Sequence, residues 1–310
     1  MQPFILSAIY EFPIMALVSM GFFIALRMLK FPDLTIDAAV MGGMTAVGVA
    51  IPGFGIWWSL FLAAFLGAVT GLLTGLLHAN KHVGVSQILA GMLVSFAAYS
   101  VFFRALGHRA ELSLFRYRDV IFGESDPELV KVGIGLSLVV VVYVVTAAAF
   151  KTPFGYALRV SGHRPEMMRV LGIQPEMVGV LGLCLSNAVV GVGGWFSAVS
   201  NTNIGLQNFG MVIHALAAVK IGDFFQGVLS FFIPAIKNNR SSMFVVMIAP
   251  LGGALVYSFI KSFVLQILSG ELKHAITQDF QLVVAFAILL SVTIGRRFYV
   301  NSAVDQNEVF

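Results

Sequence analysis

The chain has 310 residues, of which 58% are hydrophobic and only 11% are charged, and its mean hydropathy is +0.92. Soluble proteins carry about 25% charged residues, so this composition excludes an ordinary soluble enzyme and indicates a membrane protein. The net charge is +4, but the basic residues are dispersed among loops, which argues against nucleic acid as a partner. The single cysteine, Cys184, excludes an internal disulfide and a cysteine-rich metal site.

Apolar runs follow one another along the whole chain. A membrane-spanning helix needs roughly 17–25 residues to cross about 30 Å of hydrocarbon. We therefore predict an all-α, polytopic transmembrane helical bundle in membrane lipid, forming a single domain over residues 1–310. The nine predicted spans are Phe12–Met28, Leu34–Ile51, Ile56–Leu77, Gln87–Phe103, Val132–Phe150, Met177–Ser200, Phe209–Phe232, Met243–Leu268 and Phe280–Ile294.

The second predicted span is short and glycine-rich and carries Asp37, so we expect it to be broken or only partly spanning. A charge inside a membrane is costly and is therefore a functional candidate. One interpretation is that Asp37 lines a translocation path or holds a broken helix in place. The other is that Asp33 and Asp37 serve the N-terminal end of a helix near the interface, where carboxylates are favoured.

Small residues mark faces for close helix packing. Gly67, Gly71 and Gly75 lie at i, i+4 and i+8 of the third predicted span and give it one smooth side. Gly191 and Gly194 form a weaker strip on the sixth. We expect both strips to pack helices together, and in a dimer some of these residues would line the subunit interface.

The connection between the fifth and sixth spans is polar and predicts a short helix with clear ends. Pro165 suits the first helical position, Glu166 suits the positive N-terminal end, Arg169 lies near the C-terminal end and Gly172 suits C′.

A short charged helix held between two spans can receive a push from a soluble partner and pass it to both. Pro175 would open the span that follows it. The alternative is a solvated loop that contains a helical turn.

Polar side chains elsewhere are weaker candidates. Asn187, Asn201 and Asn203 lie between the middle of the sixth span and its following loop, where they could form walls for a polar solute. Alternatively, the segment after Ser200 is an ordinary external turn.

Two lysines and a histidine fall inside later spans. Lys220 and Asp223 are three apart and could form a helical ion pair, although snorkelling to the interface is the simpler account. Lys261 is interpreted in the same way, and His214 as a hydrogen-bonded core residue.

The distribution of Lys and Arg orients the bundle. With the N-terminus outside and nine alternating spans, eleven of the 19 basic residues fall in inner loops and six in outer ones. This places the C-terminus and the loop 151–176 in the cytoplasm, and the polar loop 104–131 outside.

Sequence motifs for catalysis are absent. No G-x-x-x-x-G-K-[ST] phosphate loop occurs, so we expect no ATP hydrolysis by this chain and no enzymatic activity. His78 and His82 straddle a helix end without an acidic third ligand, so we expect no metal site and no cofactor bound by this chain.

Three patterns over about residues 20–225 resemble one family. G-x-A-L-R-x-x-G at 155–162, followed by L-G-I at 171–173, is similar to the cytoplasmic loop of ABC importer permeases of the branched-chain amino acid and ribose type. F-P-D-L-T-I-D at 31–37 resembles the second membrane segment of a subgroup usually paired with binding proteins for aromatic or other amino acids. L-S-N-A at 185–188, running to N-I-G at 203–205, resembles the segment after the loop.

The resemblance implies a permease subunit in a bacterial cytoplasmic (inner) membrane, carrying a small polar solute that is an amino acid or a related compound. Expected partners are ABC ATPase subunits that hold ATP and Mg, an external solute-binding protein and a second permease chain, giving a homodimer. The loop 151–176 would contain the coupling helix. The residues implied in ATPase coupling are Gly155, Ala157, Arg159, Gly162, Arg164, Pro165, Glu166, Arg169 and Gly172, and the path candidates are Asp37, Asn187, Asn201 and Asn203.

Two other classes of protein stay open. A secondary transporter driven by an ion gradient would need a committed membrane acid, for which Asp37 is the candidate, and usually two similar halves, which are not apparent. An integral membrane enzyme would need a reactive cluster at one interface, and the sequence has none.

Overall fold

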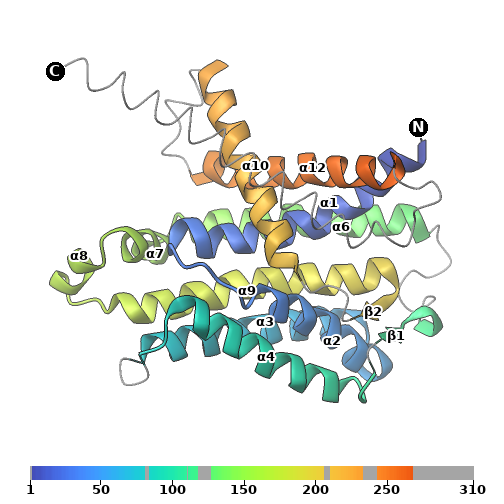
Figure 1. Cartoon of the computed structure of the whole chain (residues 1–310), viewed down its shortest axis with the longest axis horizontal. Helices are drawn as coiled ribbons and strands as arrows, with labels where there is room; N and C mark the ends of the chain where they lie inside the picture. The colour runs from blue at the N-terminus through green and yellow to red at the C-terminus, as the bar shows by residue number, and fades with distance from the viewer. Residues whose placement is uncertain are drawn as a thin grey trace.

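A computed structural model describes residues 2–80, 84–109, 111–117, 127–205, 210–232 and 243–267. Helices make up most of this part of the chain and form one elongated bundle (Figure 1). The elements in chain order are α1 (Gln2–Phe23), the π turn η1 (Ile24–Met28), α2 (Ile36–Phe54), α3 (Ile56–Ala79), α4 (Gln87–Ala105), β1 (Glu111–Ser113), the 3-10 turn η2 (Phe115–Tyr117), α6 (Pro127–Ala149), α7 (Pro153–His163), α8 (Pro165–Val170), α9 (Pro175–Asn201), β2 (Asn203–Gly205), α10 (Met211–Phe232) and α12 (Met243–Ile267).

Seven of the described helices are long and apolar enough to cross a membrane: α1 with η1, α2, α3, α4, α6, α9 and α12. The predicted multi-pass helical bundle is therefore confirmed. The predicted seventh span, Phe209–Phe232, contains α10, which is not one of the seven. The ninth, Phe280–Ile294, lies outside the described residues, so nine spans and the placement of the termini stay predictions.

The predicted start of the first span was wrong. Helix α1 begins at Gln2 rather than Phe12 and has Pro13 in its interior. Glu11 interrupts the apolar run in the sequence, but its carboxylate forms an ion pair with Lys261 of α12. Pairing makes this charge tolerable within the helix.

Three helices form the centre of the bundle. The most apolar stretches of α1 and α2 are each 72% buried and that of α9 is 56% buried, whereas those of α3, α4 and α6 are 33%, 28% and 22% buried. The outer helices thus carry their apolar side chains on the surface. A large apolar exterior suits lipid and not water.

The glycine strips pack α9 against its neighbours. A Cβ atom at Gly67 would lie 2.2 Å from the carbonyl oxygen of Asn187, and one at Gly71 would lie 2.3 Å from that of Leu183. Further along α9, a Cβ at Gly194 would lie 2.1 Å from the carbonyl oxygen of Val40 in α2. The predicted close packing is confirmed, and these positions are covered within the chain rather than left open for a subunit interface.

A non-helical segment, residues 29–35, connects η1 at the end of α1 to α2, and we call it the extended segment. It returns along the bundle from the end where α7 and α8 lie, so that α2 begins partway along the bundle (Figure 1). Helix α2 then runs unbroken from Ile36 to Phe54, with Pro52 in its last turn. The expectation of a broken or only partly spanning helix was therefore wrong, because α2 is continuous and long enough to cross a membrane.

The end opposite α8, here the β end, carries a small antiparallel ribbon (Figure 1). Strand β1 pairs with β2, with Leu112 opposite Ile204. The all-α prediction missed it because strands of three residues are too short to give an alternating pattern. The ribbon joins the polar loop 104–131 to the segment that follows α9.

Candidate functional site

The turn between α7 and α9 lies at the far left of Figure 1 and has the predicted helix, α8, at its tip. Pro165 begins α8, Glu166 is in its first turn and Arg169 in its last. Each residue type suits the position that it occupies. The predicted coupling-loop helix is therefore confirmed as a structural element.

Gly172 ends α8 as predicted. Its φ is +75°, and its N–H donates to the carbonyl of Arg169 at 3.1 Å, while the N–H of Ile173 donates to the carbonyl of Met168 at 2.9 Å. This pair of bonds is the Schellman motif, which needs a left-handed residue at C′. Pro175 then begins α9.

Helix α8 presents an apolar surface to its surroundings. Met168 is buried and anchors the helix, but Val170 is 88% exposed and Leu171 is 72% exposed. Met167 and Ile173 are also exposed, and we call these four exposed residues the α8 surface. Arg164 and Glu166 are exposed beside them. Exposed apolar side chains with charged side chains beside them are typical of a docking surface for a protein.

Arg169 has a different role from its neighbours. Its guanidinium donates to the Glu176 carboxylate at 2.8 Å and so joins the last turn of α8 to the first turn of α9. The Arg169–Glu176 ion pair therefore stabilises the shape of the loop.

The spacing of the two glycines in α7 is explained by packing beneath the helix. A Cβ at Gly155 would lie 2.4 Å from the backbone of Phe150, and one at Gly162 would lie 2.1 Å from the carbonyl oxygen of Met28. Leu158 is fully buried between them. The inward face of α7 is thus fitted to the end of α6 and to the start of the extended segment.

Arg159 also holds α7 against the end of α6. Its guanidinium donates to the Phe150 carbonyl at 3.4 Å and lies over the ring of Tyr156, 4.6 Å from the ring centre. Ala157 is half-buried beside it. These motif residues position the loop rather than face outward.

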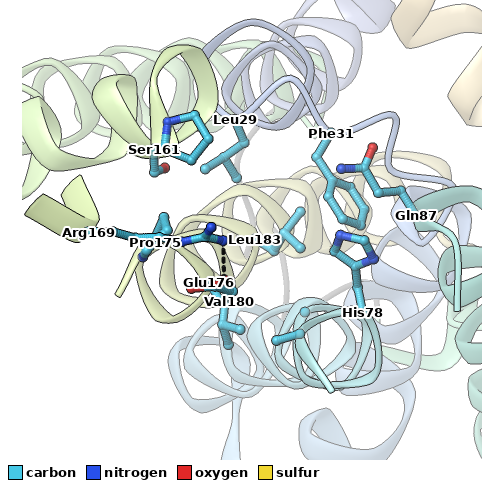
Figure 2. Close-up of a pocket in the computed structure, with 14 residues that line it drawn as sticks. Leu29, Phe31, His78, Gln87, Ser161, Arg169, Pro175, Glu176, Val180 and Leu183 are labelled. Carbon is cyan, nitrogen blue, oxygen red and sulfur yellow. Dashed lines mark hydrogen bonds and ion pairs between the residues drawn. The ribbon is translucent and has the colours of Figure 1, made fainter. Parts of the chain in front are cut away.

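A pocket of about 370 Å³ lies between α3, α7, α8, α9 and the start of the extended segment (Figure 2). The extended segment contributes Phe31, α3 contributes His78, α8 contributes Arg169 and α9 contributes Glu176 to its walls. The rings of Phe31 and His78 meet edge to face with their centres 5.4 Å apart. The pocket separates the α7–α8 turn from the end of α3, which leaves space beside the extended segment.

Asp33 is the centre of a buried polar cluster. One carboxylate oxygen accepts the Asn187 amide at 2.6 Å, and the other accepts the Thr35 N–H at 2.8 Å and its hydroxyl. The Thr35 hydroxyl lies 2.9 Å from that of Thr74. Asp33, Thr35 and Asn187 are completely buried. The cluster therefore ties the extended segment to both α3 and α9.

Asn187, a predicted path residue, lies inside this cluster and not on an open surface. Its amide group also donates to the Leu183 carbonyl at 3.1 Å, but its buried Oδ1 has no hydrogen-bond partner among the described residues. A buried acceptor without a donor costs about 1–3 kcal/mol, so this oxygen can accept a further hydrogen bond.

Asp37 caps a different helix from its own. It lies in the first turn of α2, but its carboxylate oxygens accept the backbone N–H groups of Gly210 and Val212, each at 3.1 Å, where α10 begins. A carboxylate is favourable at a helix N-terminus. Asp37 thus holds the start of α10 against the start of α2.

The other predicted path residues lie elsewhere. Asn201 and Asn203 are exposed at the β end, at the close of α9 and in β2, apart from the Asp33 cluster. The amide of Asn201 donates to Ser197 at 3.4 Å. The structure therefore does not bring the four path candidates into one site.

Two ion pairs were not predicted. Asp223 pairs with Arg27 at 2.6 Å and not with Lys220, the possible partner that the local spacing offered, and Lys261, for which snorkelling was expected, pairs with Glu11. The partners are 196 and 250 positions apart, so local spacing gave no signal. His214 shares a hydrogen bond with the Tyr257 hydroxyl, as expected of a bonded core histidine.

No group of three or more potential metal ligands occurs in the part of the chain that the structure describes. His78 shares a hydrogen bond with the Val85 carbonyl at 3.0 Å, and His82 lies outside the described residues.

Residues 4–293 match the model of a family described as branched-chain amino acid transport system / permease component. The chain belongs to this family. Its members are membrane components of ABC transport systems and do not form a catalytic family.

Two curated proteins illustrate the similarity. The chain is 25% identical over 224 residues to a tyrosine transport system permease protein of Clostridioides difficile, covering 70% of this chain and 72% of that protein. It is 27% identical over 220 residues to an uncharacterized protein of Rickettsia prowazekii, covering 70% of this chain and 76% of that one. No solved structure matches significantly.

Proposed function

We propose that this permease is the membrane subunit of an ATP-driven importer and that a separate ATPase subunit docks on the α8 surface. The observation that carries the proposal is the exposure of Val170 and Leu171, 88% and 72%, on a turn whose shape is fixed by Gly172 and by the Arg169–Glu176 pair. A rigid turn with exposed apolar side chains can bind a partner with little loss of conformational entropy.

The orientation of the chain and the other components of the importer are also part of the proposal. The α8 end faces the cytoplasm, because the predicted inner loops hold most of the basic residues. The β end, with Asn201 and Asn203, would then receive solute from an external binding protein. Two copies of the chain in a bacterial cytoplasmic membrane would enclose the path, and ATP and Mg would be held by the ATPase.

The proposed solute is an amino acid or a related small compound. Support comes from the permease family and from the relative whose name gives tyrosine as its transported compound. Transport would proceed by a switch between two global states that the ATPase stabilises differently when it binds and hydrolyses ATP.

A secondary transporter is the weaker alternative. Three acids inside the described bundle have structural partners: Asp33 binds Thr35 and Asn187, Asp37 caps α10, and Glu11 pairs with Lys261. An ion-coupling site would need an acid that can exchange its partner for the transported ion.

Co-purification with an ABC ATPase encoded near this permease, where the gene neighbourhood supplies one, tests the proposal. The wild-type chain is expected to retain the ATPase through detergent extraction, and the double variant Val170→Glu, Leu171→Glu is expected to lose it. Arg169 is unsuitable for this test because its substitution would also break the bridge to Glu176. Phe115→Glu, at an exposed apolar position of η2 near the β end, is the matched control and is expected to retain the ATPase.

If the wild-type chain never retains an ATPase, the importer proposal fails and transport driven by an ion gradient becomes the better hypothesis. If both variants retain it equally, the ATPase docks elsewhere.

A further inference from the structure

The extended segment 29–35 touches the coupling turn at one end. Gly162 of α7 packs directly on its start: a Cβ there would lie 2.1 Å from the Met28 carbonyl oxygen and 2.9 Å from the Cα of Leu29. Contact between backbones leaves no flexible side chain to absorb movement. A displacement of α7 therefore has to displace residues 28 and 29.

The other end of the segment leads to two helix N-termini. Asp33 fixes it to Asn187 of α9, and through Thr35 it meets Thr74 of α3. The next turn begins α2, where Asp37 accepts the N–H groups of Gly210 and Val212. The segment thus connects the coupling turn to the paired starts of α2 and α10.

We propose that residues 29–35 act as a hinge that carries movement of α7 and α8 to the starts of α2 and α10, with Asp33 and Asp37 as positioning residues. This inference rests on the proposed importer function. It assigns a role to Asp33 and to the α2–α10 contact that neither the family match nor the ATPase docking surface supplies.

Three observations favour a second arrangement of this segment. Lys30 has a φ of +53°, an unfavourable conformation for a residue with a Cβ. Leu29 and Phe31 border the pocket of about 370 Å³ beside α8, so there is space for them to move into. The buried Oδ1 of Asn187 has no partner among the described residues, which leaves an acceptor ready for a different set of hydrogen bonds.

Hydrogen exchange in the assembled complex tests the hinge without knowledge of the solute. The permease would be purified with its ATPase, and amide exchange compared between ADP and a non-hydrolysable ATP analogue. Peptides covering α8 report docking and those covering Gly210–His214 report the start of α10. In the wild-type complex we expect nucleotide to change exchange at both places, with about a tenfold difference at Val212, a magnitude typical of coupling between sites.

Gly162→Ala inserts a methyl group at the hinge contact, and Gly133→Ala is its matched control, because a Cβ at Gly133 meets nothing within 4 Å. Gly162→Ala is expected to keep the ATPase bound and the response at α8, and to lose the difference at Val212. A purely structural role would shift exchange equally with both nucleotides and preserve the difference. Asp33→Asn, which keeps the side-chain shape, is the second variant if Gly162→Ala does not assemble.

The outcomes separate the two proposals. A wild-type chain that holds no ATPase overturns the importer function. A wild-type complex that responds to nucleotide at α8 but not at Gly210–His214 overturns the hinge alone. The hinge is also overturned if the assembled hinge variant retains the full wild-type difference at Val212.

Discussion

The α8 turn and the Asp33 cluster are built by opposite means. The turn is specified within a few residues, from Pro165 to Gly172, and exposes its apolar side chains. The cluster joins Asp33 to Asn187, 154 positions away, and is completely buried. Local rules thus define the surface that we propose as a docking site, whereas the groups that hold the interior in place depend on the whole fold. Substitutions in the two regions should therefore have different effects on stability and on partner binding.

The largest expected effect is at the centre of the cluster. Asp33→Leu leaves the Thr35 N–H and the Asn187 amide without their buried acceptor, and is expected to lower the free energy of unfolding by about 3 kcal/mol. Thermal unfolding in detergent measures this. Asp33→Asn, which still offers one acceptor, should lose clearly less. Equal stability of the leucine variant and the wild type would contradict the role given to the cluster.

Glycine packing between α3 and α9 gives the next effect. Gly67→Val places a side chain against the carbonyl of Asn187 and is expected to cost about 1–3 kcal/mol of stability. Gly252→Val in α12 is the control, because a Cβ there meets nothing within 4 Å. The same unfolding assay compares the two, and similar losses would mean that helix propensity, not packing, dominates.

The end of α8 should respond more mildly. Gly172→Ala puts a side chain on a residue with φ of +75°, which costs about 1 kcal/mol. The expected result is an unchanged midpoint of global unfolding, faster amide exchange in α8 and weaker retention of the ATPase. Gly179→Ala, where a Cβ also meets nothing within 4 Å, should alter none of these.

The smallest effect is expected at the Arg27–Asp223 pair. The Arg27 side chain is 51% exposed, and exposed ion pairs contribute about 0.2–1 kcal/mol. Arg27→Gln should therefore shift the unfolding midpoint only slightly, and less as salt is added. A loss comparable with that of Asp33→Leu would place this pair among the groups that hold the interior together.

The same contrast explains what the sequence could predict. The spans follow from composition, and α8 follows from Pro165, Glu166 and Gly172, because residue type and position decide these features locally. The glycine strip on α3 could also be predicted, since its spacing repeats every helical turn.

Long-range contacts could not be predicted in this way. The sequence allows Asp37 to be a cap for its own helix or a path residue, but its partners belong to the start of α10, 173 and 175 positions away. The Glu11–Lys261 pair and the β1–β2 ribbon depend equally on distant segments. The predicted spans leave residues 29–33 between two helices, but the path of this segment along the bundle could not be predicted, because tertiary hydrogen bonds to Asp33 and Thr35 hold it in place.

The central claim is that the α8 surface binds an ATPase, and a photo-crosslinking residue at position 170 tests it most directly. Val170 is the most exposed residue of this surface, and its side chain takes no part in the Gly172 cap or the Arg169–Glu176 bridge. Illumination of membranes from cells that express the whole transport system should link position 170 to a protein with a phosphate loop, and the same probe at position 115 should not. Crosslinks from position 170 to lipid alone, with the neighbouring ATPase present in the membranes, would contradict the claim.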